Sequence, residues 1–181
     1  EMYKQLGAQK TIDFMSNVQF LIKEYNMHHG FSVGLADCIS DNPKFYEELR
    51  IHLEDAKLQV EAISIKPGQN VNPIIAEQIE KKSMEILDNA KTKSDNIAMK
   101  YISQLNNLQI MSASRSGAKG EATNSIQIMS TMGQQKESGK RIPASLPGGR
   151  SLPVYKPGDT DPTSRGFCME SFASQLTPEG F

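Results

Sequence analysis

Two long stripes of apolar residues, separated by a short break, constrain the fold more than any other feature of this sequence. In the first stripe, apolar side chains recur at helical spacing at Phe45, Leu49, Leu53, Ala56, Val60 and Ile63. The second stripe contains Ile75, Ile79, Ile86, Ala90, Ile97, Tyr101, Leu105 and Leu108. Because residues three or four apart share one face of an α-helix, each stripe predicts one amphipathic helix.

The residues around the break predict where both helices begin and end. The segment Lys66–Asn70 contains a proline and a glycine, which should end the first helix near Ile65. Asn42–Pro43 and Asn72–Pro73 each place a capping side chain before a proline that suits the first helical turn. Two long helices joined by so short a turn should pack antiparallel as a hairpin.

The other segments predict smaller elements around this hairpin. Apolar residues recur at helical spacing from Gln9 to about Met27, which indicates a further amphipathic helix. From Pro143 the sequence is rich in Pro, Gly and Ser and has no sustained period. The expected fold is therefore mainly α, with a long antiparallel helical hairpin, shorter flanking helices and an irregular Pro/Gly-rich C-terminal segment.

Charge, cysteine spacing and hydropathy exclude several classes of function. The net charge of −1 predicts no general affinity for nucleic acid, so any phosphate contact must come from local placement. Cys38 and Cys168 lack CxxC spacing, and we interpret them as reduced, partly buried thiols. No apolar run reaches the ~18 residues that span a bilayer. We therefore expect an intracellular protein without a membrane partner.

The segment from Met111 to Ile142 contains the residues most suggestive of chemistry. Lys119 lies between Gly117 and Gly120, on a loop whose backbone can adopt conformations closed to other residues. Such a lysine can meet a triphosphate as a point charge, but the local sequence alone favours an ordinary solvated turn lysine. The GxxxxGK[ST] spacing of a phosphate-binding loop is absent from this segment.

A group of amide and basic side chains follows Lys119. Gln127 and Gln134 are seven residues apart, so on a continuous helix they would share one face. Together with Gln135 they could donate to and accept from a neighbouring helix or a small molecule. Lys140 and Arg141 close the segment as a basic turn. Solvent-exposed glutamines and lysines remain the ordinary alternative.

Four motifs in the same order resemble the largest subunit of multisubunit DNA-directed RNA polymerases, especially the eukaryotic and archaeal type. The motifs are HGFSVGLAD at 29–37, SGAKG followed by SIQIMSTMGQQ and GKRIP within 116–143, SRGF at 164–167 and LTPEGF at 176–181. The resemblance to RNA polymerase II implies the end of the pore region at 1–40 and the funnel domain with its helical hairpin at 41–142. It implies that 143–181 leads toward the cleft and trigger loop.

The resemblance also implies roles for the candidate residues. Lys119 would approach the phosphates of entering nucleotides or of backtracked RNA. Gln127, Gln134, Gln135, Lys140 and Arg141 would lie on the channel surface beside the bridge helix and trigger loop, where amatoxin-type inhibitors bind. Asp88 and Lys91 stand where the family often has Asn and Arg, so a toxin site here would be altered.

The family comparison further implies partners and a location. The parent enzyme would be a nucleotidyltransferase whose partners are other polymerase subunits, nucleoside triphosphates, backtracked RNA and a TFIIS-type cleavage factor. The magnesium-binding NADFDGD motif of the family is not in this sequence, so we expect an inactive fragment with no cofactor of its own. The location would be the nucleus for a cellular polymerase II, or the cytoplasm or virion for a viral one.

Two other functions fit parts of the sequence. A free-standing helical-hairpin adaptor would use its charged faces to bind a partner coiled coil. Such an adaptor has no need for a lysine between two glycines, which distinguishes it from the polymerase interpretation. A small nucleotide-binding enzyme is the weaker alternative, because the sequence has no complete phosphate loop and no metal-ligand motif.

Overall fold

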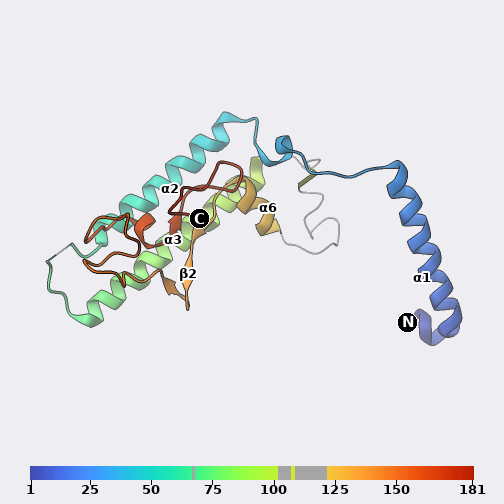
Figure 1. The fold of residues 1–181 in the computed structure, drawn as a ribbon, viewed down its shortest axis with the longest axis horizontal. Coiled ribbons are helices and arrows are strands. Elements are labelled where there is room, and N and C mark those ends of the chain that lie inside the picture. Colours follow the sequence, from blue (N-terminus) through green and yellow to red (C-terminus); the bar gives the residue numbers. More distant parts are fainter. Residues whose placement is uncertain (67, 102–106, 109–121) are drawn as a thin grey trace. The chain divides into compact units, whose positions relative to one another are not determined.

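The computed structural model describes residues 1–66, 68–101, 107–108 and 122–181, and all statements about structure refer to these ranges (Figure 1). Leu105 of the second apolar stripe lies outside them. The chain divides into two compact units, Glu1–Val33 and Gly34–Phe181. Within the described ranges, no helix combines the length and the hydropathy that a membrane crossing requires.

The first unit consists mainly of helix α1, Met2–His28. Gly7 interrupts it with non-helical dihedral angles, φ 79° and ψ 174°, a region that glycine adopts at little cost. No residue of α1 is buried, although it carries large apolar side chains such as Phe14, Leu21 and Tyr25. The prediction of a helix between Gln9 and Met27 is confirmed.

The second unit is built on helices α2, Pro43–Ile63, and α3, Pro73–Tyr101. Both predicted starts are confirmed, because the Asn42 side chain accepts from the Lys44 amide at 3.1 Å. The Asn72 side chain likewise accepts from the Ile74 amide at 2.9 Å. Asparagine before proline therefore starts both helices, since the amide oxygen satisfies an N–H that has no partner inside the helix.

Helices α2 and α3 pack along one seam, which forms the core. The α2 side is the predicted stripe, with Phe45, Leu49, Leu53, Ala56 and Val60 buried. The α3 side differs from its predicted stripe and buries Ser83, Leu87, Ala90, Ser94, Ile97 and Ala98. Leu87, Ile97 and Ala98 of α3 join the α2 residues in the core cluster, and the Ser94 hydroxyl donates to the Ala90 carbonyl at 2.9 Å. Serine is therefore buried with little cost where its own helix offers an acceptor.

Contacts at one end of the seam show that the two helices run antiparallel. Tyr101, the last residue of α3, donates to the Glu48 carboxylate near the start of α2 at 2.5 Å. Its ring also lies 5.9 Å from the ring of Phe45. Figure 1 shows the two helices side by side, with the short break joining their other ends. The mainly α fold that the sequence predicts is confirmed.

Short elements cover this helix pair. A 3₁₀ helix, Leu35–Cys38, precedes α2, and helix α6, Ala122–Met129, follows α3. Four two-residue strands come next, and a second 3₁₀ helix, Pro162–Arg165, precedes the last of them. The strands are β1, Gly133–Gln134; β2, Lys136–Glu137; β3, Lys140–Arg141; and β4, Phe167–Cys168. β1 pairs antiparallel with β4, and β2 with β3. β1 and β4 therefore bring two distant segments together beside α3.

The segment from Pro143 is irregular, as predicted, and is fastened to the helices by side chains. Lys57 on α2 lies 2.6 Å from the Asp161 carboxylate. The Thr131 hydroxyl donates to the Cys168 carbonyl at 2.8 Å. Gly166, with φ 91°, ends the second 3₁₀ helix in a left-handed conformation beside Ile142. The chain can reverse here because the position has no side chain.

Replacing Gly166 by alanine should destabilise the fold more than replacing Gly139. Both glycines have positive φ, so each alanine costs about 1 kcal/mol of backbone strain. A Cβ at Gly166 would lie 2.6 Å from an Ile142 carbon, whereas one at Gly139 would meet nothing within 4 Å. Overpacking should add about 1–3 kcal/mol to Gly166→Ala alone. Urea denaturation of both variants measures this difference, and equal losses would contradict the packing of Gly166.

Candidate functional site

The first predicted site residue, Lys119, lies outside the described residues, as do Gly117 and Gly120 beside it. The structure describes the elements on either side of that segment, α3 before it and α6 after it. The five other predicted residues are described. They do not lie on one helix. Gln134, Gln135 and Arg141 bind other groups of the same chain.

The predicted helix that would join Gln127 to Gln134 is wrong. Helix α6 ends at Met129, so Gln127 lies within it and Gln134 lies in strand β1. Gly133, with φ 75°, comes just before Gln134, and a Cβ there would lie 2.6 Å from the Lys91 side chain. Gly133, with its left-handed backbone directly against Lys91 of α3, belongs to the extended segment that follows the end of α6. Seven-residue spacing therefore does not put the two amides on a common face.

Two of the glutamine side chains bind nearby backbone groups. The Gln134 amide nitrogen donates to the carbonyls of Gln135 at 2.6 Å and Arg165 at 2.9 Å. The Gln135 amide nitrogen makes longer contacts, 3.4 Å to the Gly133 carbonyl and 3.5 Å to that of Met132. The Gln134 amide oxygen is buried without a hydrogen bond among the described residues. Gln134 thus links β1 to the chain reversal at Arg165.

Arg141 and Lys140, predicted together as a basic turn, have different environments. They form strand β3, which returns toward β2 through Ser138 and Gly139. The Lys140 side chain is exposed, whereas Arg141 is only 6% exposed. Alternation along a strand sends neighbouring side chains to opposite faces, which explains the difference. Lys140 alone of the two is available at the surface.

A carboxylate on α3 binds Arg141 and a second arginine that the sequence interpretation did not select. Arg141 donates its Nε and Nη2 to the two Glu80 oxygens, at 2.9 Å and 2.8 Å. Arg165 donates its Nη2 to Glu80 Oε1 at 3.1 Å and its Nε to the Ile142 carbonyl. We call Glu80, Arg141 and Arg165 the Glu80 cluster. It connects α3, β3 and the second 3₁₀ helix.

The electrostatics of the Glu80 cluster follow from partial burial and close pairing. The hydrogen bond from Arg141 lowers the pKa of the Glu80 carboxyl below its ordinary value, although burial opposes this change. Burial lowers the pKa of the Arg165 guanidinium, and the positive charge of Arg141 acts in the same direction. The cluster therefore contains one strongly stabilised carboxylate and two guanidinium groups that share it.

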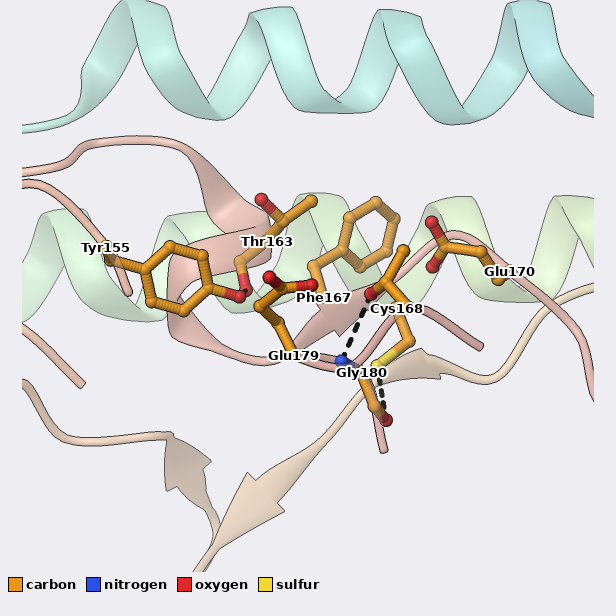
Figure 2. A pocket seen from close by; sticks show the side chains of 8 residues that line it. Tyr155, Thr163, Phe167, Cys168, Glu170, Glu179 and Gly180 are labelled. Atoms are coloured by element: carbon orange, nitrogen blue, oxygen red, sulfur yellow. Dashed lines mark hydrogen bonds between the residues drawn. The ribbon is translucent and has the colours of Figure 1, made fainter. Parts of the chain in front are cut away.

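A separate cavity of about 180 Å³ lies beside strand β4 (Figure 2). Figure 2 shows the Cys168 sulfur directed toward the Gly180 carbonyl, a contact of 3.7 Å, with Tyr155 and Glu179 nearby. Burial raises the pKa of the Cys168 thiol, so the thiolate needed for nucleophilic chemistry is disfavoured. Among the described residues, no three His, Cys, Asp or Glu side chains are grouped as metal ligands would be.

A protein-family model described as RNA polymerase Rpb1, domain 4, matches residues 63–168, which is more than half of the chain. The chain belongs to this family. It therefore carries a domain of the largest subunit of DNA-directed RNA polymerase, a nucleotidyltransferase that acts in transcription with other subunits. The polymerase resemblance is thus confirmed at the level of the subunit.

The matched range contains every predicted site residue and the whole Glu80 cluster. It begins at the last residue of α2 and ends at the last residue of β4. Glu80 was not selected from the sequence, and Arg165 was included only as part of the SRGF motif. The only sequence signal for the cluster was that motif, since Arg165 lies 85 residues from Glu80. Pairing over such a separation has no local pattern.

Replacing Glu80 by glutamine should destabilise the domain 4 fold by about 1–3 kcal/mol, because two guanidinium groups would lose their shared carboxylate. Glu77→Gln is the matched control on the same helix, since Glu77 is 69% exposed and, among the described residues, pairs only with Lys81 one turn away. Glu77→Gln should lower the free energy of unfolding by at most about 0.5 kcal/mol. Urea denaturation near neutral pH compares the two, and equal losses would contradict the role of the Glu80 cluster.

Acid should remove the stabilisation that Glu80 provides. Because its folded-state pKa is lowered, the carboxylate stabilises the fold above its unfolded value of about 4.3. This contribution is lost as the pH falls through the folded-state pKa. The free energy of unfolding, measured between about pH 3 and pH 7, should fall less steeply with acid in Glu80→Gln than in the unsubstituted chain. Identical slopes would show that Glu80 has an ordinary pKa.

Proposed function

We propose that this chain forms the funnel of the polymerase largest subunit, which lines the secondary channel that admits nucleoside triphosphates and receives backtracked RNA. The observation that carries the proposal is the family match over 63–168, together with the four ordered motifs in the sequence. In the same proposal, residues 1–40 form the end of the pore region and 143–181 lead toward the trigger loop.

Lys119 is the proposed contact with the phosphates of incoming nucleotides or backtracked RNA. It belongs to the sequence between α3 and α6, and glycines at 117 and 120 leave its backbone free to approach a ligand closely. An ammonium group contributes a point charge that suits a triphosphate in several orientations. This residue would therefore help to hold phosphates without taking part in bond formation.

The proposed channel surface follows the strands and not a single helix. Lys140 is exposed and can meet a ligand or a mobile catalytic element directly. Gln134 and Gln135 bind backbone carbonyls, so their contribution would be to fix the surface beside the channel. Gln127 on α6 is partly exposed. An amatoxin-type inhibitor would meet these residues beside Asp88, which pairs with Lys136 at 2.8 Å.

The outer face of α2 is the proposed docking surface for a TFIIS-type cleavage factor. Ile51 and Leu58 are 51% and 63% exposed and lie seven residues apart, so they share a face away from the seam. Glu54 and Asp55 lie between them and are also exposed. An apolar pair flanked by carboxylates fits a partner surface with apolar and basic side chains.

The parent enzyme would work where transcription takes place. That is the nucleus for a cellular polymerase II, and the cytoplasm or virion for a viral enzyme. Its catalytic magnesium would be bound by the aspartate loop that the family carries outside this sequence. The residues of this chain would act beside that metal by shaping the channel and contacting phosphates.

Replacing Lys119 by alanine in the intact polymerase should lower kcat/KM for nucleotide addition about three- to tenfold, because one cationic phosphate contact is lost. Single-nucleotide addition on an assembled template measures this effect. Lys156→Ala, in the irregular segment, is the matched control and should leave the rate unchanged. Wild-type rates of addition and transcript cleavage for Lys119→Ala would overturn this assignment.

Leu58→Glu in the intact polymerase should weaken cleavage stimulated by the factor and leave elongation without the factor unchanged. The apolar contact is replaced there by a charge that must remain solvated. Val154→Glu is the matched control, since Val154 is 62% exposed and lies outside the hairpin. Titration of the cleavage factor against stalled complexes measures the change. Unaltered half-saturation for Leu58→Glu would exclude this face as the docking surface.

A further inference from the structure

The Glu80 cluster contains more positive than negative charge. Arg141 and Arg165 both donate to Glu80, the only carboxylate with which either pairs among the described residues. The side chains of Arg141 and Glu80 are 6% and 30% exposed, and that of Arg165 is 26% exposed. A surplus cation in a partly buried site is costly unless an anion offsets it.

The two guanidinium groups also have donors to spare. Each guanidinium carries five N–H groups. The bonds seen within the described part of the chain use the Nε and Nη2 atoms of Arg141 and the same two atoms of Arg165. Each Nη1 has no hydrogen bond there. Unused charged donors beside a cavity are the groups that an oxyanion recognises.

A cavity of about 350 Å³ adjoins these donors. Arg141, Arg165, Lys140, Glu80 and Glu137 are among the residues that line it. Lys140 forms no ion pair with any described residue, and Glu137 is its cross-strand partner in β2 and β3. Three cations thus face two carboxylates, which leaves one positive charge for a ligand.

Asp159 is a further carboxylate near the cluster, and it lies at a different cavity. It lines a different cavity, of about 120 Å³, together with Glu80 and both arginines. One oxygen of its carboxylate accepts the Asp161 backbone amide at 2.9 Å. Asp159 is not among the residues that line the larger cavity. The lining of the cavity beside β3 therefore contains three cations and two carboxylates, and Asp159 adds its negative charge on the side of the smaller cavity.

We propose that this cavity binds a phosphate group, free or carried by a nucleotide, through Arg141, Arg165 and Lys140. Guanidinium groups offer paired N–H donors that match two oxygens of a phosphate, and Lys140 supplies a movable third cation. Glu137 opposes the ligand electrostatically and keeps its affinity low. The site rests on Glu80, Glu137, Lys140, Arg141 and Arg165. It shares Lys140 with the proposed channel surface and does not depend on Lys119.

The site is tested by titrating the 181-residue chain with inorganic phosphate at constant ionic strength and following the Arg141 and Arg165 side-chain Nε–H signals by NMR. Saturable shifts at both arginines, with a millimolar dissociation constant, are expected. A parallel titration with ATP distinguishes the sources, because tighter binding identifies a nucleotide and equal binding identifies the phosphate group alone. Absence of saturable shifts with either probe would overturn the site.

Two substitutions in the β2–β3 pair should act in opposite directions. Lys140→Gln should weaken phosphate binding about threefold, and Glu137→Gln should strengthen it by a similar factor, as expected for one screened charge near the ligand. Lys136→Gln is the matched control, because Lys136 belongs to the same strand pair and does not line the cavity. An effect of Lys136→Gln as large as that of Lys140→Gln would mean general charge attraction and would refute the proposal. Unchanged binding in Glu137→Gln would refute it as well.

Discussion

The seam between α2 and α3 is the interaction on which the rest of the larger unit depends. Bulky side chains such as Phe45 and Leu53 on α2 pack against a face of α3 that contains Ser83, Ala90 and Ser94. Small residues let the helices approach closely, and apolar burial supplies most of the driving force. α6, β1 and the second 3₁₀ helix contact this pair directly. The seam therefore sets the positions from which Glu80 and Lys57 reach the later part of the chain.

Charged contacts then attach an irregular segment that could not form a core alone. The region after Met132 contains only two-residue strands and one short 3₁₀ helix among its described elements, so it buries little apolar surface in regular structure. Asp161 on Lys57 and Arg165 on Glu80 hold it against the two helices. These bonds join groups that the seam has already fixed, so less side-chain freedom is lost when they form. Both ion pairs involve residues of the later segment that lie within the family match, Asp161 and Arg165.

The sequence predicted the parts of this structure that obey local rules. Asparagine before proline marked both helix starts, and the α2 stripe matched the buried residues because each was apolar at helical spacing. The α3 stripe was partly wrong because it left out Leu87, which is fully buried, and included Ile75, which is 49% exposed. It also could not select the buried Ser83 and Ser94, since periodicity counts only apolar residues. Gln134 was misplaced because α6 already ends at Met129 and the chain is extended from Gly133. Arg141 resembled a surface cation because its partner, Glu80, lies 61 residues earlier.

The order of the Glu80 cluster along the chain has a consequence for synthesis on the ribosome. Glu80 emerges first, and Arg141 and Arg165 follow 61 and 85 residues later. The helix pair can close before Arg141 and Arg165 emerge, because all residues of α2 and α3 precede them in the chain. Until Arg141 and Arg165 emerge, the Glu80 carboxylate has neither of its arginine partners. The nascent domain thus begins as an acidic helical scaffold, and it acquires its cationic surface only when the last segment folds back.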